Sequence, residues 1–304
     1  MIKVDSISAL HKILDCENPK HPLITLIDSS CIKFDKKYFD SDIIPEFYMI
    51  TLKDNSDCEL IYGRKNYDFH EGSLVFMHPG KVLKANGWYE PKQSDNGWSL
   101  CFHPDLIKSS ELYNKISMYS FFQYESTEAL HLSNQEKIII QRIVRNIQDE
   151  YSANLDSYSN NLIISYIEML LTYIERFYGR QFITRAHVYK EAVIKFKQLL
   201  NEQCSIEFIE NSGMPTVKNL AREMGYSSNY LSDMLKKETG KTAQEHIKLH
   251  LLELAKNMLL STNEPINYIA TILGFEQASS FTKFIKAKLG VSPLDYRKQN
   301  IHST

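Results

Sequence analysis

The last third of the chain contains one amphipathic pattern twice. In each copy, apolar residues spaced i, i+3, i+4 and i+7 lead to a glycine, and these two glycines are 49 residues apart. The first copy is Val217, Leu220, Ala221 and Met224 before Gly225; the second is Ile266, Ile269, Ala270 and Leu273 before Gly274. A second apolar run follows each turn: Leu231 and Leu235 before Gly240, and Phe281 and Ile285 before Gly290. The spacing predicts two helix-turn-helix units, whose second helices suit a DNA major groove.

A plain helical bundle would show the same periodicity, so the polar residues and the connector matter. Small residues, Ala221 and Ala270, stand four positions before the turn glycines, where two crossing helices approach closely. The second helices carry polar and basic side chains of the kind that contact bases and phosphates. The capping box Thr242 to Glu245 opens a single apolar-faced helix between the copies. Such a connector would hold two recognition helices apart to match major-groove faces about 34 Å apart.

Together these features resemble a known family of DNA-binding domains. Thr216 to Lys298 is similar to the DNA-binding domain of AraC/XylS-type transcription regulators. The most specific matching residues are Ile269, Ala270, Leu273, Gly274, Phe275, Phe281, Lys286, Gly290, Ser292, Pro293, Tyr296 and Arg297. The resemblance implies a regulator that binds double-stranded promoter DNA, forms a homodimer, and responds to a small-molecule effector or a partner. A regulator of this type that activates transcription would also contact RNA polymerase.

The same resemblance assigns candidate DNA-binding residues on both recognition helices. In the first helix, Asn229, Ser232 and Asp233 match positions that reach bases, and we expect Lys236 and Lys237 to hold phosphates. In the second helix, the matching base positions are Ala278, Ser279, Thr282 and Lys283, and Lys286 lies on the backbone side. Because several of these second-helix residues are short, the first helix or DNA shape is expected to carry more of the discrimination.

Charge and cysteine usage agree with a DNA-binding half in a cytoplasmic protein. From Pro215 to Thr304 there are 12 Lys and Arg against 8 Asp and Glu, a formal charge of +4, whereas the remainder carries −6. The basic excess therefore falls on the repeat, although ordinary surface variation could produce it too. The chain shows no long apolar run and no signal peptide at Met1, so we expect no membrane contact. Its five scattered cysteines predict neither a disulfide nor a structural zinc site.

The front of the chain has a strand-like pattern instead. Short runs rich in β-branched and aromatic residues, punctuated by glycines, are His21–Asp28, Glu46–Leu52, Glu59–Tyr62, Gly72–Met77 and Gly97–Phe102. They predict a small antiparallel β-sandwich or barrel. Ahead of an AraC-type domain, this resembles the cupin-like sensor half of that family. Aromatic residues in this region would suit an apolar or sugar-like ligand, or simply fill the core: Tyr62, Tyr67, Phe69, Phe76, Trp88 and Trp98.

Enzymatic activity is not expected. The candidate metal ligands of a cupin enzyme are His70, Glu71, His78 and His103, but no His-x-His pair occurs. Neither a nucleophile elbow nor a glycine-rich phosphate loop is present in the sequence, and no cysteine and zinc cluster suggests DNA repair. We therefore expect no catalytic residue, no metal and no cofactor.

Between the halves the sequence predicts helices. One begins at the capping box Ser133 to Glu136, a more apolar one carries Leu162 to Phe177, and another runs from Tyr189 to Glu202. They would pack onto the barrel or form a dimer seam. The predicted fold class is thus α+β: a cupin-like antiparallel β-sandwich or barrel at 1–132, a helical dimerisation segment at 133–204, and an all-α domain with two helix-turn-helix units joined by a linker helix at 205–304. Cys204 to Pro215 is predicted to be the linker.

Overall fold

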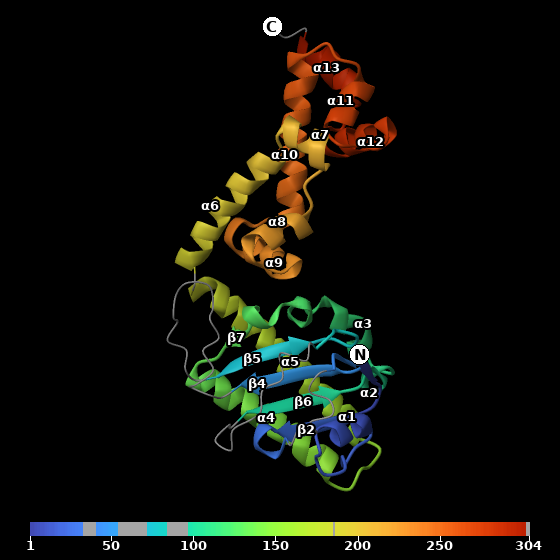
Figure 1. Ribbon diagram of the computed structural model, residues 1–304, viewed down its shortest axis with the longest axis vertical. Helices are drawn as coiled ribbons and strands as arrows, with labels where there is room; N and C mark the ends of the chain where they lie inside the picture. Colours follow the sequence, from blue (N-terminus) through green and yellow to red (C-terminus); the bar gives the residue numbers. More distant parts are fainter. Residues whose placement is uncertain (33–40, 54–71, 84–96, 185, 302–304) are drawn as a thin grey trace. The chain divides into compact units, whose positions relative to one another are not determined.

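The computed structural model describes residues 1–32, 41–53, 72–83, 97–184 and 186–301 (Figure 1). They fold into two compact units, Met1–Thr184 and Arg185–Thr304. The first unit combines a β-sheet with helices, and the second is helical. This division differs from the three predicted segments. The boundary falls at Thr184 rather than at Cys204, because the last helix of the predicted middle segment packs inside the second unit.

Four strands of the first unit lie where the sequence predicted them, and three others were not predicted. The described strands are β1 (Ile2–Val4), β2 (Ile24–Asp28), β3 (Ile43–Pro45), β4 (Tyr48–Lys53), β5 (Ser73–Met77), β6 (Trp98–Phe102) and β7 (Leu130–His131). Five of them form an antiparallel sheet in the order β2-β6-β4-β5-β7, and β1 pairs with β3 in parallel. Within the described ranges the strands form one five-stranded and one two-stranded sheet, which do not confirm the predicted sandwich or barrel. The strand predicted at Glu59–Tyr62 lies outside those ranges.

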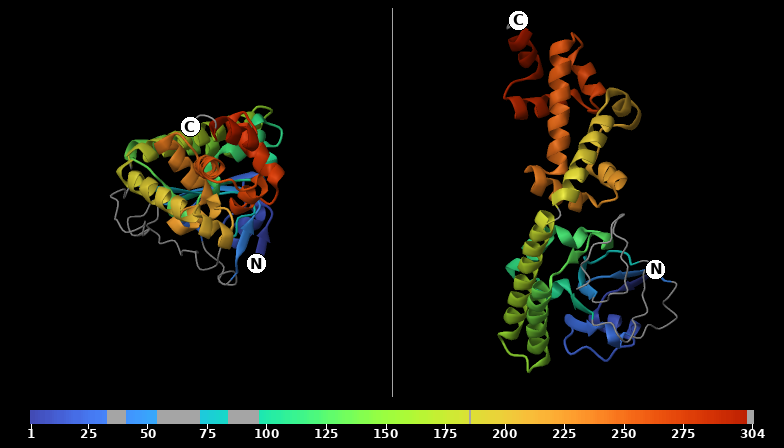
Figure 2. Two further views of the ribbon diagram at one scale, coloured as in Figure 1. Left: turned by 90° about the horizontal axis from the view of Figure 1, so that it is seen from above. Right: turned by 90° about the vertical axis from the view of Figure 1, so that its left-hand side faces the viewer.

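One face of this sheet has a buried apolar centre. Ile50, Leu52, Leu74 and Leu100 are completely buried, and the register places them on the same face. The helices α4 (Asn134–Ser152) and α5 (Ser159–Thr184) form an antiparallel pair that covers this side of the sheet (Figure 2). Burial of these branched side chains between a sheet and a helix pair is the main favourable term in the folding of the unit.

A polar contact locks the helix pair to the sheet. The Arg180 guanidinium donates to both carboxylate oxygens of Glu136, at 3.0 and 2.6 Å, and also to the backbone carbonyl of His131 on β7 at 2.7 Å. Glu136 is also the capping-box residue of α4, so the Arg180–Glu136 pair joins the start of α4 and the end of α5, and Arg180 adds the bond to the edge strand β7. The capping box predicted at Ser133 is confirmed.

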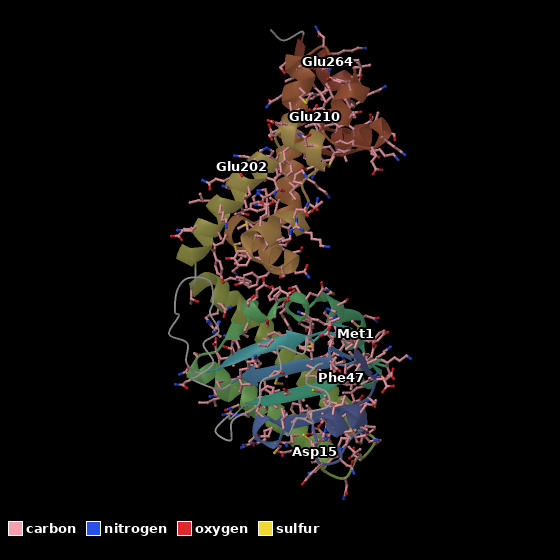
Figure 3. The ribbon with its side chains drawn as sticks, in the orientation of Figure 1. Met1, Asp15, Phe47, Glu202, Glu210 and Glu264 are labelled. Carbon is pink, nitrogen blue, oxygen red and sulfur yellow. The ribbon has the colours of Figure 1, made fainter. Side chains whose placement is uncertain are left out.

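The opposite face of the sheet is covered in part by α1 (Ile7–Ile13), which the sequence analysis did not predict. Its apolar side chains share a core with β1, β3 and Phe47, which is fully buried and labelled in Figure 3. The remaining short elements follow β2 or β6: η1 (Ser29–Cys31), α2 (Pro104–Ile107), α3 (Glu111–Lys115), η4 (Ile116–Met118), η5 (Ser120–Gln123) and η6 (Ser126–Glu128).

The second unit contains α6 (Ala186–Gln203), α7 (Ile206–Ser212), α8 (Val217–Met224), α9 (Ser228–Thr239), α10 (Ala243–Ser261), α11 (Ile266–Ile272), α12 (Ala278–Leu289) and α13 (Pro293–Ile301). The predicted all-α character is confirmed, including the Thr242 capping box of α10. Of the predicted linker, residues 206–212 are helical. No helix in the described ranges is both long enough and apolar enough to cross a membrane.

Candidate nucleic-acid interface

The first helix-turn-helix unit is built by α8 and α9. Thr216 caps α8 by accepting from the Asn219 backbone N–H at 3.1 Å, and the helix ends at Gly225, which has φ of +75°. In the left-handed region a side chain would clash with the backbone, so glycine suits this turn. The Tyr226 N–H then donates to the Ala221 carbonyl at 2.9 Å. Ala221 is buried, as close helix approach requires.

The second unit, α11 and α12, repeats this geometry. Gly274 has φ of +78°, and the Phe275 N–H donates to the Ala270 carbonyl at 2.9 Å, the same bond at the same distance as in the first unit. Ala270 is also buried, and Phe281 and Ile285 anchor α12 in the core with no exposure. The internal repeat predicted from the sequence is therefore a structural repeat.

Four of the candidate DNA-binding residues of α9 lie on one helical face. Asn229, Ser232, Asp233 and Lys236 are spaced i, i+3, i+4 and i+7, opposite the buried Tyr230, Leu231, Met234 and Leu235. The structure leaves Lys236 and Lys237 exposed, whereas Asn229, Ser232 and Asp233 are half-buried. The polar base-contacting candidates therefore lie near the helix start, and the lysines lie further along it.

On α12 the exposed face is formed by Ser279, Lys283 and Lys286, spaced i, i+4 and i+7. Ala278 and Thr282 are half-buried, and the Thr282 hydroxyl donates to the Ala278 carbonyl at 2.9 Å. This bond turns the threonine hydroxyl back onto its own helix. Gln277, the N-cap residue, is exposed and accepts from the Ser279 hydroxyl at 3.3 Å. The sequence analysis missed Gln277, although an exposed amide at a helix start is well placed for bases or phosphates.

Two residues that match the family have structural positions here. Arg297 donates to the backbone carbonyls of Leu259 at 3.0 Å and Glu264 at 2.8 Å, and so ties α13 to the end of α10 and the loop before α11. Ser292 accepts from the Asp295 N–H at 3.2 Å at the start of α13. Arginine bonded to two carbonyls satisfies helix-end groups that would otherwise lack partners.

The helix α6 is part of this domain. Phe196 is completely buried and packs edge-on against the His246 ring, and α6 contacts both α8 and α9. The pKa of His246 is lowered by burial and by the nearby Lys241 and Lys197. His246 Nε2 lies 2.7 Å from the Thr239 hydroxyl, which joins the start of α10 to the end of α9. The apolar face of α6 was visible in the sequence, but nothing there indicated which unit it covers.

The histidines considered as metal ligands have other contacts. His78 Nδ1 lies 2.7 Å from the Pro79 carbonyl, and His103 caps α2 by accepting from the Asp105 N–H at 3.2 Å. His70 and Glu71 lie outside the described residues, as do Tyr62, Tyr67, Phe69 and Trp88. Among the residues that are described, no group of three His, Cys, Asp or Glu side chains is placed to hold a metal ion. Phe76 and Trp98 belong to the buried face of the sheet.

Comparisons with known proteins agree with this geometry. A helix-turn-helix domain family matches residues 220–299. The regulator YobQ of Bacillus subtilis is 37% identical over 106 residues, 34% of this chain and 44% of YobQ. The multiple antibiotic resistance protein MarA of Salmonella typhimurium is 33% identical over 87 residues, 29% of this chain and 68% of MarA. The match thus spans less than half of YobQ and about two thirds of MarA.

Solved structures were compared as well. The C-terminal domain of the response regulator yesN from Fusobacterium nucleatum has 32% identity, covers 33% of this chain and 96% of that one, and gives a TM-score of 0.30. ToxT from Vibrio cholerae has 13% identity, with coverage of 90% and 97% and a TM-score of 0.26. TM-scores of this size do not establish a shared fold.

Two helix-turn-helix units at the two ends of one connecting helix define a class of DNA-binding domain. The sequence identity to MarA, over more than two thirds of its length, identifies the family within that class. The chain belongs to the AraC family of DNA-binding transcription regulators.

Proposed function

We propose that this protein binds double-stranded promoter DNA sequence-specifically through α9 and α12, one in each of two successive major-groove faces. The observation that carries the proposal is the pair of matching turns at opposite ends of α10 (Figure 1). A 19-residue helix is about 28 Å long. This length is close to the roughly 34 Å repeat of major-groove faces along B-DNA. The connector thus supports simultaneous docking of both recognition helices.

Side-chain chemistry divides the roles on α9. Asn229 can donate to and accept from adenine in a bidentate pair, and Asp233 can accept from the amino group of cytosine. Ser232 lies between them on the same face and can bond to either. The exposed Lys236 and Lys237 attract phosphates without regard to sequence.

On α12, Lys283 is the side chain best suited to a base, because it is exposed and can donate to guanine O6 and N7. Ser279 supplies a short polar contact next to it, and Lys286 is placed for the phosphate backbone. Ala278 and the inward-turned Thr282 hydroxyl offer little direct base contact. DNA shape therefore contributes more of the discrimination at this helix.

For the N-terminal compact unit, Met1–Thr184, we propose the role of a cupin-like sensor controlled by a small-molecule effector. An open cleft of about 1050 Å³ lies between the outer edge of β2 and α4. It is lined by Tyr151, whose hydroxyl accepts from the Leu26 N–H at 2.9 Å, and by Arg142 and Arg145, which make no ion pair with any described residue. The volume is at the upper end of the range for small-molecule sites. These two guanidinium groups, which have no carboxylate partner among the described residues, favour an anionic group on the part of the ligand that faces α4.

We also propose that the protein acts as a homodimer through α5. Leu162 and Met169 are 43% and 47% exposed. They lie about two turns apart on the same side of α5, whose other side is buried in its own unit. Two linked chains would double the DNA contacts and raise avidity. A dimer seam along this stripe would remove both side chains from water.

The experiment that tests the DNA-binding proposal is selection from a random double-stranded DNA library at two salt concentrations, followed by sequencing of the retained molecules. We expect an enriched motif of two half-elements about one helical turn apart, with retention that falls as salt rises. Salt-dependent retention without an enriched motif would contradict sequence-specific binding.

A further inference from the structure

The segment between α6 and α8, which the sequence predicted to be a linker, joins the two helix-turn-helix units. We call Ser205–Pro215 the strap. Ser205 caps α7 by accepting from the Phe208 N–H at 3.3 Å, and Ile209 of α7 is 3% exposed. Besides α6, α7 contacts α11 of the second helix-turn-helix unit. In Figure 3, the labelled Glu210 on α7 and Glu264 before α11 lie toward the C-terminal end of α10.

The contact between the strap and the second unit is close at one point. A Cβ atom added to Gly274 would lie 2.9 Å from Met214 Cγ, 3.2 Å from Ile209 Cγ2 and 3.4 Å from the Met214 backbone nitrogen. The first unit offers a direct comparison, because a Cβ at the equivalent Gly225 would meet nothing within 4 Å. The strap therefore covers the turn at Gly274 in the second helix-turn-helix unit, whereas the corresponding turn at Gly225 in the first one has space beside it.

The other end of the strap is fixed to the first unit. Pro215 is buried, and Thr216 directly after it is the N-cap of α8. Just before the strap, the Gln203 amide donates to the Glu223 carboxylate of α8 at 2.8 Å. The two helix-turn-helix units are consequently connected twice, once through α10 and once through the strap.

These two connections constrain different motions. The helix α10 fixes the separation of the two helix-turn-helix units along its axis. At its far end, α11 and α12 pack on it through an apolar core, and Arg297 of α13 donates to the Leu259 carbonyl. Repacking of those side chains would allow the second unit to rotate about α10. The strap touches the turn between α11 and α12 and so adds a second restraint on that rotation.

We infer that the strap contact of Ile209 and Met214 with Gly274 fixes the orientation of α12 relative to α9, and thereby restricts the half-element spacing that this protein accepts on DNA. The inference rests on the proposed function, since spacing has meaning only if both recognition helices dock. A specificity element of this kind needs no contact with DNA, because it acts by preorganising the two recognition helices.

The test is a binding selection with the full chain on a library in which the two half-elements are separated by a varied spacer. Met214→Ala and Ile209→Ala remove strap contacts. Leu249→Ala is the control, because Leu249 lies on α10, is 37% exposed, and belongs neither to the strap nor to the core that α10 shares with α11 and α12. A thermal melt accompanies each variant, and Met214→Leu and Ile209→Val replace any alanine variant that does not fold.

We expect the wild-type protein to favour its best spacing over spacings one base pair longer or shorter by about fivefold or more, the lower end of the cost of one mismatched base pair. The strap variants should bring that ratio close to one while they keep salt-dependent binding at the best spacing, and Leu249→Ala should keep the wild-type ratio. Folded strap variants with an unchanged spacing profile would overturn this inference and leave the proposed function standing. A wild-type protein that enriches no paired motif would overturn the proposed function, and the inference with it.

Discussion

The hydroxyl groups of Tyr189 on α6 and Tyr230 on α9 lie 2.7 Å apart in the buried interior of the second unit. The contact shows that α6 is part of the DNA-binding domain and packs next to α9, the second helix of the first helix-turn-helix unit. Tyr189→Phe or Tyr230→Phe should each lower the stability of this domain by about 1 kcal/mol, the net contribution of a typical hydrogen bond.

The double variant provides the sharper measurement. In a double-mutant cycle by urea unfolding, the two tyrosines should show a coupling free energy above the roughly 0.3–0.5 kcal/mol seen for distant sites. Tyr268→Phe, an exposed position in the same unit, is the matched control and should not couple to either. Purely additive effects would mean that the hydroxyl contact contributes no stability.

The two turn glycines differ in a measurable way. Gly225→Ala should cost about 1–2 kcal/mol, because the residue must remain in the left-handed region. Gly274→Ala carries the same backbone cost and adds the overlap with Met214, for a further 1–3 kcal/mol or so of overpacking. Thermal melts of both variants check the order. Equal losses would contradict the close packing of the strap on the second unit.

His246 makes the stability of the second unit depend on pH. Burial, with Lys241 and Lys197 nearby, lowers its pKa below the usual 6.5, so the unfolded chain takes up a proton before the folded domain does. Stability should therefore be complete above pH 6.5 and fall as the pH decreases from 6.5 toward the lowered pKa. His246→Gln should reduce the fall in melting temperature between pH 7.5 and 5.5. An identical fall in both proteins would exclude His246 as its cause.

The exposed stripe on α5 predicts an effect on oligomeric state. Met169→Glu should shift the protein toward the monomer in sedimentation velocity at a fixed concentration, because a charge would be buried in the proposed seam. Met118→Glu, at a position 76% exposed outside α5, is the control and should leave the distribution unchanged. A Met169→Glu protein that sediments like the wild type would contradict this seam.

The helices of the repeated unit were predictable because local features specify them: the Thr242 capping box, the glycine turns at Gly225 and Gly274, and the 3.6-residue spacing of buried residues. Four strands of the sheet were predictable for a similar reason. The parallel pairing of Ile2–Val4 with Ile43–Pro45 was not, since it depends on contacts between segments about forty residues apart.

The role of the linker region could not be predicted either. Asn211, Ser212 and Gly213 read as helix-breaking residues. Only Gly213 lies outside the helix, as the C-cap of α7, whereas Ile206–Ser212 are helical and contact α6 and α11. The candidate site shows the same limit. The family resemblance indicated Ser279, Lys283 and Lys286 as candidates in advance, whereas the bond of the Thr282 hydroxyl to the Ala278 carbonyl appears only in the folded helix.

The most direct test of two-helix recognition measures the affinity of Asn229→Ala and Lys283→Ala for the selected site and for sites with either half-element scrambled. Each variant should lose about 1–3 kcal/mol on the intact site. On a site whose α9 half-element is scrambled, Asn229→Ala should bind as tightly as the wild-type protein does. On a site whose α12 half-element is scrambled, the same should hold for Lys283→Ala. Equal losses by both variants on every sequence, random DNA included, would show that α9 and α12 do not each recognise a half-element.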